Sequence, residues 1–368
     1  MKLLSKPTAA APLPATKDSA APVPEETRRL NPLELPAWDS LVRSHPTSSF
    51  FHGTAWARVL LETYGYRPFY FAGFDAQRLL TLLPVMEVSS WLTGRRGISL
   101  PFTDECPLLS SFATTPSDLF EQVMACGKAR GWRYWQGRGG RKLFSWAPPS
   151  VTFFGHMLDL SMGEERLFAG LQSPVRRAIR KGEKEAVTVE MAQSLEAVQS
   201  YYSLHCATRR RHGLPPQPFA WFRNIHRHVL AEKLGQVVLA KLGSRPVAGA
   251  VFFHLGDKAL YKYGASDPAF PHLRGSNLVI WEAVKWYSRN GYRQLDFGRT
   301  SKTNDGLRRF KLGWGTEEHL IEYLKYDLGK RAFVAEKDEA EGWHNQLFRR
   351  LPLFLSRMIG ACLYRHCA

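Results

Sequence analysis

The sequence predicts an α/β protein built from two similar halves, each a mostly antiparallel sheet flanked by helices. The clearest evidence is an antiparallel meander, with strand-like runs at Gln236–Leu242, Val247–Leu255 and Lys258–Ser266 and glycine-containing turns between them. Both halves also repeat one order of elements: a helix, strands joined by tight turns, a helix closed by glycine, and a strand that begins with an aromatic residue. This order indicates an internal structural duplication.

The first half begins with helices. Apolar residues at helical spacing predict helices near Leu35–Ser44 and Gly53–Tyr64, and Thr54 is placed to cap the second one. A further helix, Pro116–Arg130, has proline in its first turn and a glycine directly after it. Alternating apolar residues and turn signals predict strands at Arg67–Phe74, Leu79–Val88, Ile98–Phe102 and Trp132–Gln136.

The second half follows an apolar run, Val151–Leu160, which we interpret as a crossover between the halves. A short, strongly basic helix comes next. The other predicted elements outside the meander are helices near 193–212, 217–233 and Ser276–Asn290 and a strand at Tyr292–Phe297.

These elements divide the chain into four parts. Residues 1–28 form an Ala/Pro-rich tail that we expect to be disordered. The N-terminal half covers 30–160, the C-terminal half covers 161–330, and a basic, amphipathic helical tail covers 331–368. No apolar run reaches the length of a secretory signal or a membrane span, so neither is predicted.

Charge and cysteine content narrow the functional classes. With 50 Lys+Arg against 33 Asp+Glu, the formal net charge is +17, which favours an anionic partner: nucleic acid, an anionic membrane face or a phosphorylated substrate. The five cysteines are scattered and include no CxxC, which argues for a reducing cytoplasm and against a disulfide framework. We predict no metal, because no metal-ligand constellation, nucleophile elbow or Walker loop is present.

The end of the chain, residues 342–368, combines apolar positions at helical spacing with arginines. Two interpretations stay open. The helix packs on the body of the protein, or it lies on an anionic membrane, which would make the protein cytoplasmic and peripheral to the inner face of the cytoplasmic membrane.

Charged residues crowd together within Gly275–Gly315. Asp296 ends a short strand, and Arg299, Arg308 and Lys311 follow it. As a general base Asp296 would need a raised pKa, and an ion pair with Arg299 or Arg308 is the interpretation that we favour. Lys311 is suited to stabilise a phosphate or an oxyanion, unless it is only a solvated lysine on a basic loop.

Basic residues also cluster elsewhere. Arg176 and Arg180 lie on the short basic helix, and Arg211 ends a second basic run. A charge run is usually a solvated face, but two such clusters suggest a groove for the phosphates of a lipid- or nucleotide-linked sugar or of tRNA. Arg274 and Gly275 stand at a helix start, where backbone N–H groups bind phosphate.

Three stretches together resemble the FemAB-like branch of the GNAT acyltransferase superfamily: SPVRRAIRKGEKE from Ser173, YSLHCATRRRHG from Tyr202, and LDFG with GLRRFKLGWG between Leu295 and Gly315. FFHGTAW and LPLFLSRMIG resemble members associated with exopolysaccharide and exosortase systems. The resemblance covers roughly residues 35–330. It implies two tandem GNAT-like domains, each a mixed, mostly antiparallel twisted sheet flanked by helices, and transfer of an acyl or aminoacyl group to an amine.

The resemblance also implies roles for particular residues. Phe310 and Lys311 match the FK of the family pattern FK-x-G-[FW]-G, in which the lysine is thought to contact donor or substrate, and Arg308 belongs to the same cluster. A carboxylate at the end of the matching first-half strand is implied as an acid or base. Asp104 is the nearer match, and Glu105 is beside it.

The acyl donor stays open between acyl-CoA and aminoacyl-tRNA, because the glycine pattern for coenzyme A is reduced here to Leu273–Ser276. We expect no tightly bound cofactor and no DNA partner. The leading hypothesis is transfer to an amine of an anionic, sugar- or lipid-linked precursor of the cell envelope or a polysaccharide. The alternatives are an acyl-CoA-dependent N-acetyltransferase for a small molecule or sugar, and a non-catalytic protein that binds anionic ligands or membranes.

Overall fold

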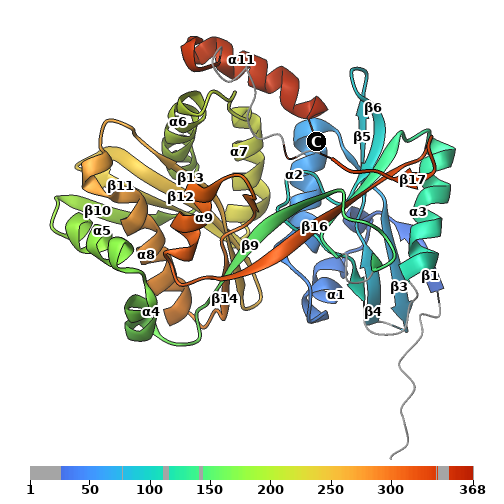
Figure 1. Ribbon diagram of the computed structural model, residues 1–368, viewed down its shortest axis with the longest axis horizontal. Coiled ribbons are helices and arrows are strands. Elements are labelled where there is room, and N and C mark those ends of the chain that lie inside the picture. Colours follow the sequence, from blue (N-terminus) through green and yellow to red (C-terminus); the bar gives the residue numbers. More distant parts are fainter. Residues whose placement is uncertain are drawn as a thin grey trace, which may run out of the picture.

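The computed structural model describes residues 26–76, 78–110, 116–140, 144–336, 338 and 348–367. Two β-sheets organise them: a small sheet in the N-terminal half and a long, twisted sheet that runs through both halves (Figure 1). Most of the predicted N-terminal tail lies outside the described residues. Residues 26–28, however, belong to strand β1 (Glu26–Leu30), which pairs with β3 instead of continuing the tail.

The small sheet has the strand order β1-β3-β4-β7, and all its neighbours are antiparallel. Helix α2 buries Trp56, Val59 and Leu60 completely, the apolar face that its spacing predicts. The elements of this region after β1 are α1 (Trp38–Ser44), α2 (Thr54–Tyr64), β3 (Tyr70–Asp75), β4 (Arg78–Leu83), β7 (Leu109–Ser110) and α3 (Pro116–Arg130).

Within the described residues the long sheet has 13 strands, with the path β10-β11-β12-β13-β14-β9-β16-β8-β6-β5-β2 and with β15 beside β9 and β17 beside β16. In chain order these are β2 (Arg67–Pro68), β5 (Met86–Ser90), β6 (Gly94–Ile98), β8 (Tyr134–Arg138), β9 (Val151–Asp159), β10 (Val187–Ala192), β11 (Gly235–Leu242), β12 (Arg245–Leu255), β13 (Lys258–Ser266), β14 (Gln294–Asp296), β15 (Thr300–Ser301), β16 (Glu317–Asp327) and β17 (Ala332–Phe333).

The C-terminal half places helices on both faces of this sheet (Figure 1). Helices α5 and α8 pack on one face of the meander, and α6 and α7 pack on the other. The helices are α4 (Glu164–Gly170), α5 (Ser173–Glu183), α6 (Leu195–Arg211), α7 (Phe219–Ile225) with the π-helical turn η4 (His226–Leu230), α8 (Gly275–Arg289), α9 (Asp305–Leu312) and α11 (Leu353–Leu363). Among the elements whose bounds the structure describes, the 3-10 turns are η1 (Pro32–Glu34), η2 (Phe50–His52), η5 (Pro271–Leu273) and η6 (Tyr364–His366). Along the described residues, no helix combines the length and apolarity needed to cross a membrane.

The predicted meander is confirmed as β11, β12 and β13, each antiparallel to the next. The middle strand, β12, is buried on both faces from Val247 to His254, because helices cover each side. A strand that is buried on both faces has a continuous apolar sequence, so it is easily predicted from the sequence.

The two halves exchange strands. Strand β9 follows the N-terminal half in sequence, yet it pairs with β14. Strand β16 comes late in the chain, yet it lies between β9 and β8. The apolar run at Val151–Leu160 is therefore a strand at the junction of the halves, and the two halves share one sheet.

Four local predictions were wrong. The strands expected at Arg67–Phe74 and Leu79–Val88 are each divided between the two sheets, as β2 and β3 and as β4 and β5. Thr54 does not cap α2: Gly53 holds the N-cap position, and the Thr54 hydroxyl donates to Asp39 Oδ2 at 2.6 Å. The strand expected at Ile98–Phe102 ends at Ile98, because the pairing with β5 uses the preceding residues from Gly94 onward.

Candidate active site

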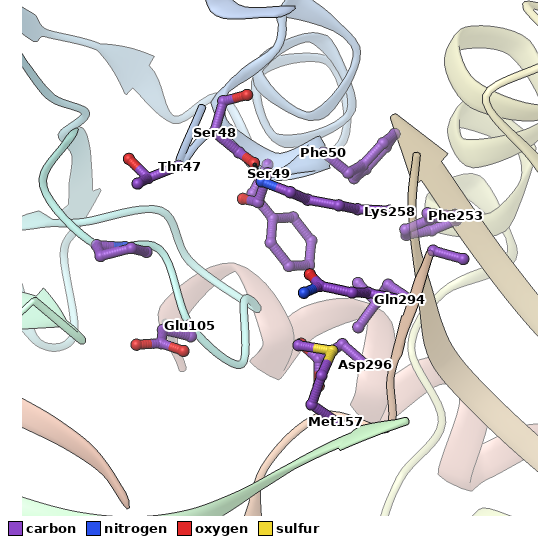
Figure 2. A pocket seen from close by; sticks show the side chains of 14 residues that line it. Thr47, Ser48, Ser49, Phe50, Glu105, Met157, Phe253, Lys258, Gln294 and Asp296 are labelled. Atoms are coloured by element: carbon purple, nitrogen blue, oxygen red, sulfur yellow. Dashed lines mark hydrogen bonds between the residues drawn. The ribbon is translucent and has the colours of Figure 1, made fainter. Parts of the chain in front are cut away.

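The two halves meet at a pocket of about 200 Å³, which we call the carboxylate pocket. Figure 2 shows Glu105 on one side of the pocket and Asp296 and Gln294 on the other, while Lys258 runs above them toward Ser49. Its lining residues are Thr47, Ser48, Ser49, Phe50, Phe51, Glu105, Pro107, Met157, Phe253, Lys258, Ala259, Leu260, Gln294 and Asp296.

Asp296 is the last residue of β14 and faces this pocket. Burial raises the pKa of Asp296 to about 6; the charges of Asp104 and Glu105 add to this, and a 2.7 Å hydrogen bond from the Gly298 N–H opposes it. A carboxyl group with this pKa is mostly ionised at neutral pH and can still hold a transferred proton. These are the properties of a general base.

The ion pair favoured from the sequence for Asp296 is absent from the part of the chain that the structure describes. Arg308 is engaged with Glu318 through two hydrogen bonds of 2.7 and 2.8 Å. The Arg299 guanidinium lies over the Phe153 ring, 4.2 Å from its centroid. Because both arginines are held elsewhere, Asp296 keeps its raised pKa.

Asp104 lies close by but is paired. Its Oδ2 is 2.8 Å from the Nζ of Lys262, whose side chain is only 6% exposed. Burial alone would raise the pKa of Asp104, but Lys262, and then Arg299 and Lys311, hold it below its usual range. Asp104 is therefore a fixed carboxylate rather than a proton acceptor.

A β-bulge brings Lys262 to this position. The register of β12 and β13 shifts where Val251 faces Tyr263 and the next residue, Phe252, faces Tyr261, so Lys262 is the extra residue. A bulge re-aims the side chain of its extra residue and leaves its backbone outside the ladder. Here it directs the lysine toward Asp104 of the other half.

Lys311 is neither solvated nor on a loop. It lies on α9, it is 3% exposed, and its Nζ donates to the backbone oxygens of Gly298 at 2.8 Å and Arg299 at 2.9 Å. Burial lowers the pKa of Lys311 to about 8, although Asp104 and Asp296 favour its charged form. Lys311 thus holds the turn whose N–H group binds Asp296.

Helix α9 was not expected from the sequence, which reads as a polar loop before Phe310. Asn304 caps the helix, since its Oδ1 accepts from the Leu307 N–H at 3.0 Å. The ring of Phe310 packs edge-on to Trp314 with centroids 6.3 Å apart. This places Phe310 at a second pocket.

The second pocket has a volume of about 210 Å³ and lies where α6 ends and α8 begins; we call it the helix-end pocket. It brings Arg211 and Phe310 together, two residues that the sequence predicts for substrate binding. Its lining residues are Thr208, Arg211, His212, Gly249, Ala250, Tyr261, Gly264, Ala265, Ser266, Ser276, Val279, Ile280 and Phe310.

Gly275 has a packing role at the start of α8. A Cβ at this position would lie 3.0 Å from Ala248 Cβ and 3.4 Å from Ala240 Cβ, so the glycine lets α8 lie directly on the sheet. Arg274, exposed and with φ of 53°, precedes the helix. The N–H groups of Asn277 and Leu278 donate to the Arg274 oxygen at 2.9 and 3.3 Å, so only the N–H groups of the first two helical residues point out of the helix without an intrahelical acceptor.

The basic helix α5 points its predicted residues elsewhere. Arg176 Nη1 donates to the Ala169 oxygen at 2.8 Å, and the Arg180 guanidinium lies 5.5 Å from the centroid of Phe168. Neither arginine lines the carboxylate pocket or the helix-end pocket.

Two lysines of β13 escaped the sequence analysis. Besides Lys262, Lys258 donates from Nζ to the oxygens of Pro46 at 2.7 Å and Ser48 at 3.0 Å, which fixes the loop that lines the carboxylate pocket. The sequence did contain a sign of their role, because both lysines stand in a predicted central strand whose other residues are mostly apolar. Charged side chains are rarely buried at such positions without a partner. In the described ranges no group of three or more His, Cys, Asp or Glu residues could hold a metal ion.

The fold and the site define a class of protein. Residues 171–319, which contain the meander, α8, Asp296 and Lys311, match the family model described as Acetyltransferase (GNAT) domain. These residues form a GNAT acyltransferase domain. Over the rest of the chain the likeness is one of fold, which the chain shares with FemX and with a tandem GNAT protein.

Solved structures share this fold over most of the chain. FemX is 15% identical, with a TM-score of 0.63, and the match covers 81% of this chain and 96% of FemX. A tandem GNAT protein from the clavulanic acid biosynthesis pathway is 10% identical, with a TM-score of 0.53 and coverage of 83% and 98%. The C-terminal domain of a putative lysylphosphatidylglycerol synthetase from Agrobacterium fabrum is 14% identical, with a TM-score of 0.51 and coverage of 73% and 86%. A comparison with curated proteins gives no match.

Proposed function

We propose that this acyltransferase moves an acyl or aminoacyl group to an amine held in the carboxylate pocket, with Asp296 as the general base. The observation that carries the proposal is the raised pKa of Asp296, about 6, on a carboxyl group that lines the pocket. Asp104, the other candidate from the sequence, has a lowered pKa and is paired with Lys262.

The reaction needs a balanced proton transfer. The amine nitrogen attacks the carbonyl carbon of the donor and forms the new C–N bond, while Asp296 accepts a proton from the nitrogen. The tetrahedral oxyanion then collapses, the bond to the donor's sulfur or oxygen breaks, and the proton passes to that leaving group. A cation near the oxyanion lowers the barrier; Lys311 supplies positive charge near Asp296, and Arg299 supplies it near Asp104.

Lys311 acts in this proposal as a positioning residue. Its two hydrogen bonds hold Gly298 and Arg299, and the Gly298 N–H in turn orients Asp296. A buried lysine in this role need not touch the substrate. Arg308 has a supporting role through its ion pair with Glu318.

The helix-end pocket is our candidate site for the acyl donor. Acyl donors of GNAT enzymes are substrates rather than tightly bound cofactors, and both acyl-CoA and aminoacyl-tRNA carry phosphates. Ser276 in the first turn of α8 and the charge of Arg211 suit a phosphate, and Phe310 offers an apolar wall. Both pockets border β13, so a donor and an acceptor would meet along this strand.

We infer that the acceptor is an anionic, sugar- or lipid-linked precursor of the cell envelope or of a polysaccharide. The formal charge of +17 supports an anionic substrate. The name of the lysylphosphatidylglycerol synthetase domain, which shares the fold, joins a lysyl group to an anionic lipid and is consistent with this acceptor class. Five free cysteines suit a cytoplasmic setting, peripheral to the inner membrane face.

A second candidate keeps the chemistry and uses acyl-CoA to acetylate a small molecule or sugar. The observation in its favour is that small residues, Gly249, Ala250 and Gly264, line the helix-end pocket and leave room for a narrow chain such as the pantetheine arm of coenzyme A. Calorimetry separates the donors: saturable binding of acetyl-CoA with none of aminoacyl-tRNA supports this candidate, and the reverse supports aminoacyl transfer.

The base assignment is tested with Asp296→Asn, which preserves size and removes the proton acceptor. We expect turnover to fall about 10²- to 10⁴-fold, with the circular dichroism spectrum unchanged. Asp267→Asn is the matched control, because Asp267 pairs with Arg245, is partly exposed, and lines neither the carboxylate pocket nor the helix-end pocket. Turnover at the wild-type level in Asp296→Asn would remove the general base from the proposal.

A further inference from the structure

The end of the chain is fastened to both halves of the protein. On the C-terminal half, Arg209 Nη2 donates to the Tyr364 hydroxyl at 2.6 Å. On the N-terminal half, Arg96 Nη2 donates to the His366 oxygen at 2.7 Å, and Ser90 Oγ lies 2.8 Å from His366 Nδ1. These hydrogen bonds fix the orientation of η6, and with it the end of α11, on the body of the protein.

Helix α11 faces the body with its small residues. Ser356 and Gly360 are buried, and a Cβ on Gly360 would lie 2.0 Å from the Pro216 oxygen. The large apolar side chains Phe354 and Met358 are 63% and 62% exposed. A helix that only packs on a protein core buries its large apolar residues, so this arrangement leaves an apolar face without a partner in the described structure.

A second apolar patch adjoins this one. Trp91 and Leu92, at the tip of the hairpin between β5 and β6, are 87% and 56% exposed. The Trp91 ring lies 5.6 Å from the ring of His366, directly after α11. In Figure 1 the hairpin and α11 lie at the same end of the molecule, opposite α4.

The charges around these side chains are uniform. Residues 88–97 and 348–367 contain no Asp or Glu. The exposed arginines on these two segments are Arg95, Arg349, Arg350, Arg357 and Arg365. We call the surface formed by these arginines with Trp91, Leu92, Phe354 and Met358 the apolar-basic face.

We propose that the apolar-basic face docks on an anionic lipid bilayer. Its apolar side chains stand on a hairpin tip and on the outward side of a helix, so they protrude instead of forming a groove for a peptide. Tryptophan and arginine suit the boundary between acyl chains and anionic headgroups. A helix lying in that plane, apolar side inward and arginines around it, is the usual form of a peripheral anchor.

This inference goes beyond the proposed reaction, because the apolar-basic face includes none of the residues that line the two pockets. The face could dock on a bilayer whether the acceptor is soluble or lipid-linked. The test measures flotation of the full chain with vesicles of phosphatidylcholine, with or without phosphatidylglycerol. We expect binding only with phosphatidylglycerol, and a loss of about tenfold or more in Trp91→Ser/Met358→Ser. Met162→Ser is the matched control: Met162 is 44% exposed and stands just before Gly163, the N-cap of α4.

Three results would overturn the proposal: no flotation of the wild type, equal flotation with pure phosphatidylcholine, or unchanged binding in the double variant. A wild-type dimer that the double variant abolishes, without vesicle binding, would assign the face to a second copy of the chain instead. Transfer to a soluble acceptor, measured without lipid, should be unchanged in the double variant. Failure of flotation is thereby separated from failure of the proposed chemistry.

Discussion

Lys262 and Asp104 form a largely buried ion pair across the two halves, 2.8 Å between Nζ and Oδ2, although 158 positions separate them in the chain. The pair does more than neutralise charge. It fixes the bulged strand of one half against the loop of the other, beside the carboxylate pocket. The geometry of Asp296 therefore depends on contacts between the halves.

Breaking this pair should be costly. Lys262→Met leaves the Asp104 carboxylate buried without its partner, and we expect a loss of about 3 kcal/mol in the free energy of unfolding. The double variant Lys262→Met/Asp104→Asn should recover a large part of that loss, because it buries no charge. Urea unfolding of the wild type, Lys262→Met, Asp104→Asn and the double variant measures the coupling energy between the two side chains. If the losses of the two single variants add up to that of the double variant, the pair contributes nothing to stability.

Lys311→Met should change the pH dependence of the reaction as well as its rate. The Lys311 charge favours the ionised form of Asp296, so its removal raises the pKa of Asp296 above about 6. The acidic limb of the kcat/KM profile should move to higher pH. Because Lys311 is buried and bonded to two backbone oxygens, some loss of stability is also expected, and turnover must be corrected for the folded fraction. A limb that stays in place would separate Lys311 from Asp296.

Stability should fall as pH rises through the titration of Asp296. Its pKa increases on folding from 3.8 to about 6, so between these pH values the folded state binds more protons than the unfolded state. The destabilisation is absent below pH about 4, complete above pH about 6, and roughly 3 kcal/mol at most. Asp104 has the opposite effect, since its pKa is lowered.

The Asp296→Asn variant isolates this contribution. Its unfolding free energy should exceed that of the wild type at pH 7 and approach it at pH 4, in denaturant titrations at each pH. Equal differences at both pH values would show that Asp296 does not titrate in this window.

Two glycines offer a matched pair of stability predictions. Gly275→Ala would bring a methyl group to 3.0 Å from Ala248 Cβ, lifting α8 from the sheet, and should cost about 1–3 kcal/mol. Gly306→Ala, in α9, meets only a side-chain oxygen at 3.8 Å and should stabilise by about 0.5–1 kcal/mol. Thermal unfolding of both variants checks the opposite signs; a neutral Gly275→Ala would contradict the close packing described for α8.

The sequence predicted the elements whose local pattern is strong. The meander was found almost to the residue, because its strands are apolar and its turns contain glycine. Helix α9 was missed, since Gly306 and four charged residues obscure the pattern within Asp305–Leu312 and the Asn304 cap is its main signal.

The site was harder to predict than the fold. Asp296 and Lys311 were identified, but their roles depend on burial and on partners distant in sequence. The sequence around Asp104 does not indicate that Lys262 forms an ion pair with it. The sequence around Arg308 likewise does not indicate that its partner is Glu318. Such pairings arise from tertiary structure, so residue type and spacing could only supply candidates.

The exchange of β9 and β16 has a consequence for how the protein is made. Strand β8 must wait for β16, which is synthesised nearly two hundred residues later, roughly ten to forty seconds at about 5–20 residues per second. During that time an emerging chain presents an unpaired strand edge that invites aggregation. Slow codons or inserted segments that lengthen the interval between β8 and β16 should therefore lower the yield of folded protein more than the same changes placed after β16.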